Sequence, residues 1–318
     1  MKKLTTAMAA AVLALAANGA LAQDLETVQV AIGSGGNLEA LITEIGKQGG
    51  IFEEYGLDPD IRYTRGGGET IQAVVSGGVQ FGVAPGGVGV ISAFTQGAPI
   101  KVVGASTTGS ANYWYVRQDS EIQKIEDFEG HSVAYSTTGS GTYNIGKMLM
   151  EQNGLTFEHV ATGGTPATFT QVMSGQVDVG FSYPEFGTDA IDRGEIRVVF
   201  RDNEIDRIKN QSLRWIIANS EASDDLVQRY MSAYQDTIDW IFSGSDEALE
   251  IYAKEIDVDL DRAKTLRDDF WSPEILTVDK VSGLDIITED AIAQGVLEGP
   301  LSAEDQAKLF QYPERIQK

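Results

Sequence analysis

The sequence predicts an α/β protein built from two similar lobes, and three observations support this prediction. The segment Gly56–Val83 aligns without a gap with Gly154–Phe181, and ten of the 28 aligned pairs are identical. Chance matching at average residue frequencies would give roughly two or three. Short apolar strands alternate with amphipathic helices around both copies. The chain of 318 residues is also long enough for two lobes with cores of their own.

Around the first copy, apolar runs predict strands, and helical spacing predicts the helices between them. The strands are expected at Thr27–Ile32, Asp60–Tyr63, Val79–Val83 and Ile100–Gly104. The helices are expected at Leu38–Gly49, Thr70–Ser76 and Val88–Phe94. Asn37 precedes the first helix as an N-cap residue, and Gly77 follows the second as a C-cap glycine. This alternation favours a parallel sheet with helical crossovers.

The second copy lies in a segment with the same alternation. A strand at Tyr113–Arg117 leads out of the first unit, and Ile125–His131 is expected to form a short helical turn. Further strands are expected at Ser132–Tyr135, Phe157–Ala161, Val177–Phe181 and Arg197–Phe200. Helices are expected at Thr142–Asn153, Ala167–Ser174 and Glu185–Arg193. The second unit therefore repeats the pattern of the first.

After the second unit the chain is expected to return to the first. The apolar run Leu213–Ala218 predicts a strand, and the segment from Asp224 to about Gln311 is mostly helical and should pack on lobe 1. Residues 23–115 and 216–318 are assigned to lobe 1, and residues 116–215 to lobe 2. The chain would then cross twice, near Val116–Asp119 and near Ser212–Trp215, and these crossings would form a hinge.

The first 22 residues have the features of a secretory signal peptide. Lys2 and Lys3 precede the apolar run Leu4–Ala17, and Ala20–Ala22 is a small-x-small cleavage site. An uncleaved anchor helix is the alternative. No later stretch approaches 18 consecutive apolar residues, so we expect a soluble mature chain. The predicted location is the periplasm.

Composition excludes several classes of function. The chain contains no cysteine, which excludes disulfides, thiol catalysis and a lipid-modified cysteine at the processing site. The formal net charge of −23 argues against nucleic acid or an anionic membrane surface as a partner. The acidity does not identify the ligand, because a local pocket in an acidic protein can still be positive.

Two glycine- and hydroxyl-rich loops follow strands and precede helices. Gly33–Asn37 resembles a dinucleotide-binding turn but is not G-x-G-x-x-G, so we interpret it as a helix N-terminus with exposed backbone N–H groups. Ser136–Thr142 carries several hydroxyl groups, and Thr142 is expected to cap the following helix. Hydroxyls beside helix N–H groups suit a carboxylate, a sulfonate or another anionic group, and an ordinary capped turn is the alternative. Gly141–Lys147 matches G-x-x-x-x-G-K, but Met148 follows where a P-loop needs Ser or Thr.

The ends of the repeated strands are the other expected walls of a cleft. Pro85 and Tyr183 follow corresponding strands, and Tyr183 offers an aromatic face and a hydroxyl group. Glu185 would accept from an amino group of the ligand or would favour the N-terminus of its own helix, and both readings stay open. Trp114 lies on an alternating strand with one face toward the core and the other toward the cleft.

Nothing in the sequence indicates catalysis or a metal site. His131 and His159 are the only histidines, neither has metal-ligand spacing, and there is no G-x-S-x-G motif. We therefore expect no enzyme activity, no cofactor and no metal.

Several motifs resemble solute-binding proteins of ABC transporters, in the group that binds nitrate, sulfonates, taurine and thiamine precursors. Gly50–Leu57 is similar to their G-I-F-x-x-x-G-L element. Ala73–Ala84 and Gln171–Phe181 resemble their A-L-x-x-G-x-x-D-x-G element, with Gln80 in place of Asp in the first and Asp178 in the second. Ile125–Ala134 resembles the entry to the second lobe. The resemblance extends from about Val28 to the late helices.

The resemblance implies a type II periplasmic-binding-protein fold and a role in ABC import. A small anionic or zwitterionic organic solute would bind between the lobes of a monomer, the hinge would close, and the closed form would dock on a membrane permease. A receptor of a TRAP-type transporter and a fold-related biosynthetic enzyme are the alternatives. The candidate ligand-binding residues are Ser34, Gly35, Asn37, Pro85, Thr108, Trp114, Thr138, Ser140, Thr142, Tyr183 and Glu185.

Overall fold

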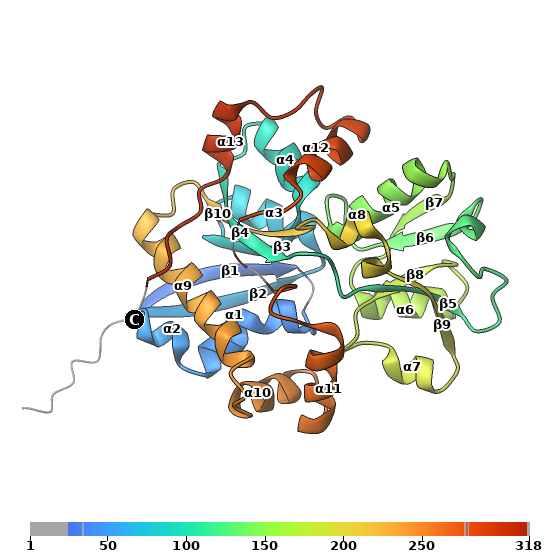
Figure 1. Ribbon diagram of the computed structural model, residues 1–318, viewed down its shortest axis with the longest axis horizontal. Helices are drawn as coiled ribbons and strands as arrows, with labels where there is room; N and C mark the ends of the chain where they lie inside the picture. The colour runs from blue at the N-terminus through green and yellow to red at the C-terminus, as the bar shows by residue number, and fades with distance from the viewer. Residues whose placement is uncertain (1–24, 34, 277, 279, 317–318) are drawn as a thin grey trace, which may run out of the picture.

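A computed structural model describes residues 25–33, 35–276, 278 and 280–316. The predicted signal peptide, residues 1–22, lies outside the described residues. The strands form two separate groups, shown on the left and the right of Figure 1. We call the part of the chain around the first group the first lobe, and the part around the second group the second lobe.

The first lobe contains a five-stranded sheet in the order β2-β1-β3-β10-β4. Its strands are β1 (Glu26–Gly33), β2 (Leu57–Thr64), β3 (Phe81–Gly86), β4 (Ile100–Thr107) and β10 (Arg214–Asn219). β1 pairs in parallel with β2 and β3, whereas β10 is antiparallel to β3 and β4. The parallel pairs confirm the predicted crossovers, and β10 confirms the predicted return of the chain.

Helices cover both faces of this sheet because its strands bury side chains on both sides. The helices of the first copy are α1 (Leu38–Gln48), α2 (Ile51–Glu54), α3 (Gly67–Val75) and α4 (Gly87–Thr95). Val30 and Ile32 of β1 pack into the core on the α1 side, whereas Ala31 packs into the core on the α3 and α4 side. This alternation follows from the two-residue period of a strand.

The C-terminal helices complete these two cores. They are α9 (Asp224–Ile241), α10 (Glu247–Glu255), α11 (Leu260–Phe270), α12 (Leu284–Ala293) and α13 (Ala303–Leu309). Tyr230 of α9 stacks on Phe81 of β3 with ring centroids 4.0 Å apart. Ile287 of α12 and Leu309 of α13 belong to the core on the opposite face. The prediction that the C-terminal helices pack on the first lobe is therefore confirmed.

The second lobe contains a three-stranded and a two-stranded sheet, in the orders β8-β5-β9 and β6-β7. The strands are β5 (Tyr113–Arg117), β6 (Ser132–Tyr135), β7 (Glu158–Ala161), β8 (Gly180–Ser182) and β9 (Ile196–Arg201). The helices are α5 (Gly141–Asn153), α6 (Thr165–Met173), α7 (Thr188–Asp192) and α8 (Asp206–Lys209), with 3₁₀ turns at Ile125–Phe128 and Asp202–Glu204. A bridge between Val133 and Val179 links the two sheets. The combined order, β7-β6-β8-β5-β9, repeats that of the first lobe.

The two copies of the sequence repeat also share their local hydrogen bonds. Thr64 and Thr70 approach through their hydroxyl oxygens at 2.8 Å, and the equivalent Thr162 and Thr168 do so at 2.6 Å. Gly77 and Gly175 both end their helices with φ near +73°, a conformation that glycine adopts without strain. The identities in the repeat therefore mark the turn and cap positions that one α/β unit requires.

Two elements near the end of the second copy are shorter than predicted. Val177–Phe181 was expected as one strand, but the ladder strand β8 covers Gly180–Ser182. The helix expected at Glu185–Arg193 is reduced to α7, because Gly187 adopts φ +93° directly before it. The hydroxyl groups of Tyr113 and Ser182 both donate to the carbonyl oxygen of Phe186 at 2.6 Å. These bonds hold Tyr183–Phe186 as a turn rather than as the first turn of a helix.

The pairing of β5 and β10 bears on the two points where the chain crosses between the lobes. β5 pairs with β9 along its whole length, from Tyr113 to Arg117, so it belongs to the second lobe entirely. We therefore propose that the first crossing precedes Tyr113 rather than lying at Val116–Asp119, and that the second precedes Arg214. The predicted lobe boundaries, at 115/116 and 215/216, stay a prediction.

His159 predicts a pH-dependent stability for the second lobe. The imidazole ring of His159 stacks on the ring of Tyr143, with the ring centroids 5.3 Å apart. Both ring nitrogens are buried without a hydrogen-bond partner, and burial lowers the pKa of His159 from 6.5 to about 4. The unfolded chain binds this proton first, so the stabilisation is complete above pH 6.5 and is lost as the pH falls toward 4. We expect a loss of roughly 2 kcal/mol between pH 7 and pH 5. Urea unfolding of wild type and His159→Phe would test this, with His131→Gln, which removes the half-exposed histidine beside Asp178, as the control, and parallel pH profiles for wild type and His159→Phe would contradict it.

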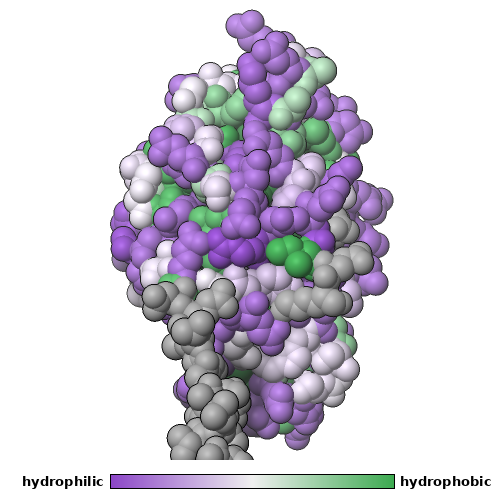
Figure 2. All heavy atoms as spheres, turned by 90° about the vertical axis from the view of Figure 1, so that its left-hand side faces the viewer, coloured by the Kyte–Doolittle hydropathy of each residue, from purple (hydrophilic) through white to green (hydrophobic). Residues whose placement is uncertain are grey.

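The surface agrees with the acidic composition. Figure 2 shows a face that is covered largely by hydrophilic residues, with hydrophobic ones scattered between them. Within the described part of the chain, none of the helices has the length and apolar character needed to cross a membrane.

Candidate solute-binding site

A small cavity of about 40 Å³ lies where the two lobes meet. The first lobe lines it with Gly33, Asn37, Glu39, Gly67, Ala84 and Arg214. The second lobe lines it with Ser136, Ser140, Gly141, Thr142, Thr165, Phe181 and Tyr183, and Asn112 comes from the first crossing. A buried water molecule needs roughly 10–15 Å³ of such space, so the closed cavity has room for a few heavy atoms.

The N-terminus of α5 supplies the hydroxyl groups of the wall. Ser140 is the N-cap residue, and its Oγ accepts a hydrogen bond from the backbone N–H of Tyr143 at 3.1 Å. The helix begins at Gly141, so the prediction that Thr142 caps it is wrong. Thr142 Oγ1 instead accepts from the backbone N–H of Ser136 at 3.0 Å and lies 3.0 Å from Ser140 Oγ. The partial positive charge of a helix N-terminus favours an anion at this position.

The N-terminus of α1 forms part of the opposite wall. Asn37 is its N-cap, as predicted, and Asn37 Oδ1 accepts from the N–H of Ala40 at 2.8 Å. The carbonyl oxygen of Gly35 accepts a hydrogen bond from the Tyr183 hydroxyl at 2.7 Å, which joins the two lobes across the cavity. Burial raises the pKa of Tyr183 to about 12, so this hydroxyl remains a donor. Ser34 lies outside the described residues.

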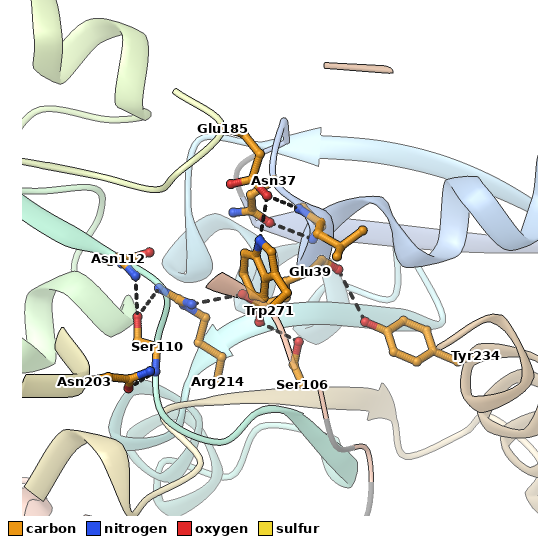
Figure 3. A network of polar contacts seen from close by, with 12 residues as sticks. Asn37, Glu39, Ser106, Ser110, Asn112, Glu185, Asn203, Arg214, Tyr234 and Trp271 are labelled. Atoms are coloured by element: carbon orange, nitrogen blue, oxygen red, sulfur yellow. Dashed lines mark hydrogen bonds and ion pairs between the residues drawn. The ribbon is translucent and has the colours of Figure 1, made fainter. Parts of the chain in front are cut away.

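A buried ion pair sits in the cavity wall (Figure 3). Arg214, the first residue of β10, donates from Nη1 to Oε2 of Glu39 on α1 at 2.9 Å. The second oxygen of Glu39 accepts from the Ser106 hydroxyl at 2.6 Å. Both side chains of the pair are at most 10% exposed. Among the described residues that line the cavity, Arg214 is the one cation and Glu39 the one anion.

Some predicted site residues lie elsewhere. Trp114 is fully buried in the core of the second lobe, where Nε1 donates to Asp202 at 2.8 Å and the ring stacks on Phe200 at 5.7 Å. It does not reach the cavity, so we withdraw it as a ligand contact. Thr108 lies at the first crossing, with Oγ1 3.0 Å from the hydroxyl oxygen of Ser212.

Two more candidates border the cavity without lining it. Pro85 is a buried residue of β3 and lies close to the start of α3. The approach is so close that a Cβ atom added at Gly67 would lie 3.0 Å from the Cα of Pro85. Thr138 lines a separate groove of about 290 Å³ between α4 and α5. The loop Thr138–Ser140 therefore separates the cavity from this groove, and only Ser140 faces the cavity.

Glu185 does not line the cavity, and its carboxyl group does not bind the N-terminus of its own helix. Its Oε1 instead accepts hydrogen bonds from groups of the first lobe, including the backbone N–H of Leu38 at 2.8 Å. Its Oε2 is buried without a partner, and burial raises the pKa of this carboxyl group. The sequence leaves a ligand amino group and the N-terminus of its own helix open as partners, and the structure gives Glu185 the N-terminus of α1.

The charged residues of the site, Arg214 and Glu39, are not among those that the sequence predicts. Arg214 interrupts the apolar run Leu213–Ala218, and a charge inside such a run is the signal that would have found it. Ser136 belongs to the hydroxyl-rich loop that the sequence marks, whereas no comparable signal marks Glu39, Asn112 or Thr165. Among the described residues, no group of three or more His, Cys, Asp or Glu side chains is arranged to hold a metal ion.

Solved structures with the same fold include binding proteins and an enzyme. The periplasmic aliphatic sulphonate binding protein SsuA from Escherichia coli matches with a TM-score of 0.67 and 17% identity, over 92% of this chain and 94% of that one. The periplasmic nitrate-binding protein NrtA from Synechocystis PCC 6803 matches with a TM-score of 0.68 and 14% identity, over 91% and 86%. The desulfurization enzyme DSZB matches with a TM-score of 0.59 and 14% identity, over 87% and 95%.

At these identities the structural matches show the fold, which is that of the periplasmic solute-binding proteins, as predicted. No curated protein matches the sequence at a significant level. A family model described as NMT1/THI5 like matches residues 40–248, which is more than half of the 318 residues. The chain therefore belongs to the NMT1/THI5-like family.

Proposed function

We propose that this protein is the solute-binding component of an ABC importer and that it captures a small anionic or zwitterionic organic solute between its lobes. The arrangement of Arg214 and the N-terminus of α5 carries the proposal, because both face one cavity from opposite lobes. Arg214 and the Ser140 and Thr142 hydroxyls suit a carboxylate or a sulfonate. Glu39 beside them offers an acceptor for an ammonium group, which a zwitterion would supply.

The family and the fold support the proposed transport role. The structural relatives named above include periplasmic binding proteins for sulphonates and for nitrate. We propose that the protein acts as a monomer in the periplasm, after cleavage behind Ala22, and that its closed form docks on a membrane permease. The alternative transport role is that of a receptor for a TRAP-type transporter.

A thermal-shift screen tests the binding function. The panel contains sulfonates, carboxylates, nitrate, amino acids, aromatic acids and pyrimidines. A solute present at 100 times its Kd should raise the free energy of unfolding by about 2.7 kcal/mol. If no compound of these classes raises the melting temperature, the proposed ligand class is wrong.

Two single substitutions test the placement of the site within one loop. Ser140→Gly removes a hydroxyl group from the cavity and costs the helix only a few tenths of a kcal/mol as an N-cap change. Thr138→Ala removes a hydroxyl group that faces the separate groove. We expect Ser140→Gly to weaken binding of a solute from the screen about 10-fold, and Thr138→Ala to leave it unchanged. Equal effects in isothermal titration calorimetry would contradict the assignment of the cavity.

An enzyme of the same fold remains the second candidate because DSZB shares the fold. Mass spectrometry distinguishes the two functions. A binding protein incubated with its solute and then denatured should release that solute unchanged, whereas an enzyme should release a product.

A further inference from the structure

One carboxyl group in the turn before α7 joins three elements of the first lobe. Oε1 of Glu185 accepts hydrogen bonds from the backbone N–H of Leu38 at 2.8 Å, from the hydroxyl of Tyr252 at 2.6 Å and from Nε1 of Trp271 at 2.8 Å. These donors belong to the first residue of α1, to α10 and to the residue that ends α11. Figure 3 shows Glu185 above Asn37, with the indole of Trp271 pointing at its carboxylate.

The contact uses a carboxyl oxygen that acts only as an acceptor. Three donors converge on one oxygen, and the first of them is an N–H group at the N-terminus of an eleven-residue helix, where a negative charge is stabilised. The donors are fixed in place before the lobes meet, because Tyr252 and Trp271 belong to the core of the first lobe. Separation of the lobes would break all three hydrogen bonds together.

The same turn carries a wall of the proposed binding site. Tyr183, two residues before Glu185, lines the cavity and donates to the carbonyl oxygen of Gly35 at 2.7 Å. On the other side, Thr188 accepts a hydrogen bond from Arg262 of α11 at 2.8 Å. Glu185 is therefore the central one of three polar links that fasten the segment 183–188 to the first lobe.

We propose that Glu185 is a positioning residue that latches the second lobe onto the first and thereby sets Tyr183 as the wall of the closed site. The inference rests on the proposed function for the site that it closes, but the latch itself requires no solute. A protein with this latch populates the closed form before any solute arrives. A closed form that is already populated raises the apparent affinity in proportion to its share of the molecules.

The latch also sets a limit on the size of the solute. With the latch engaged, the cavity measures about 40 Å³. A solute that displaces Tyr183 outward would pull Glu185 away from its three donors and lose their stabilisation. The closed site therefore selects compact, polar solutes, and Glu185 acts on this selection through Tyr183 rather than by touching the solute.

The experiment measures the distance between the lobes in solute-free protein. Because the chain contains no cysteine, Asp192→Cys on α7 and Lys254→Cys on α10 supply two unique positions for spin labels. Pulsed electron spin resonance gives the distance distribution. We compare the labelled wild type with Glu185→Ala, with the conservative Glu185→Gln, and with Trp271→Phe, which removes one donor from the other lobe. Glu195→Ala, an exposed acid of the second lobe paired with Arg193, is the matched control.

We expect the wild type and Glu195→Ala to show a population with a short distance between the labels, which is the closed form. In Glu185→Ala, the ratio of this population to the open form should be lower by about 10-fold or more. Glu185→Gln should fall in between, because its amide oxygen still accepts hydrogen bonds. Trp271→Phe should lower the population in the wild type and have no further effect in Glu185→Ala. A folded Glu185→Ala protein with an unchanged distribution would overturn the latch, and so would additive effects of the two changes. A failed solute screen would overturn the proposed function and leave this result standing.

Discussion

Replacing Arg214 with methionine should lower the affinity for an anionic solute about 100-fold. Arg214 is the cation among the described residues that line the cavity, and its guanidinium lies where the first sheet meets the N-terminus of α5. Removing one partner of a buried, charge-assisted interaction costs about 2–5 kcal/mol. Isothermal titration with a solute from the screen measures the loss.

The single substitution also affects folding, and a second variant separates the two effects. Arg214→Met leaves Glu39 buried without its 2.9 Å partner, which should lower the free energy of unfolding by about 3–5 kcal/mol. Glu39→Gln in the same chain removes that unpaired charge and keeps an acceptor for Ser106. We expect the double variant to recover most of the stability and none of the affinity. Wild-type affinity in the double variant would show that Arg214 does not hold the solute.

The ion pair also shows why the sequence predicted the scaffold better than the site. The ten identities of the repeat fall at turns, caps and core positions, where one α/β unit requires particular residues, and the structure repeats their hydrogen bonds. The helix N-termini follow from the same local patterns, so Asn37 and Ser140 were within reach. Glu39 and Arg214 are 175 residues apart, and only the insertion of β10 between β3 and β4 brings them together.

Glu185 and Trp114 depend on long-range packing in the same way. The local sequence leaves two partners open for Glu185, an amino group of the ligand or the helix that follows it, whereas its partners lie on α1, α10 and α11 of the other lobe. Trp114 was assigned to a strand correctly, but strand alternation does not tell which face points to a core and which to a cleft. The asymmetry of the repeat was still informative, since Tyr183 and Glu185, which lack counterparts in the first copy, both contact the opposite lobe.

Adding one methyl group at Gly89 should prevent the lobes from closing while leaving each lobe folded. Gly89 lies inside α4 and faces the loop before α5, so a Cβ atom there would lie 2.5 Å from the carbonyl oxygen and 2.8 Å from the Cα of Gly139. These are backbone atoms that cannot rotate away. Overpacking of this kind costs about 1–3 kcal/mol, and here the closed form alone bears it. Gly89→Ala should therefore lower solute affinity about 10- to 100-fold.

The effect on folding should be small, which makes the result specific. Alanine inside a helix is more stable than glycine by about 1 kcal/mol, and this gain offsets the loss of the closed form, so the melting temperature of solute-free Gly89→Ala should change little. Gly78→Ala is the control in the same lobe, because a Cβ there meets ordinary contacts at 3.4 Å and beyond. Small-angle scattering of the solute-free proteins should give a larger radius of gyration for Gly89→Ala than for Gly78→Ala. If Gly89→Ala closes and binds as the wild type does, then the close approach of α4 to the loop before α5 is not required for capture.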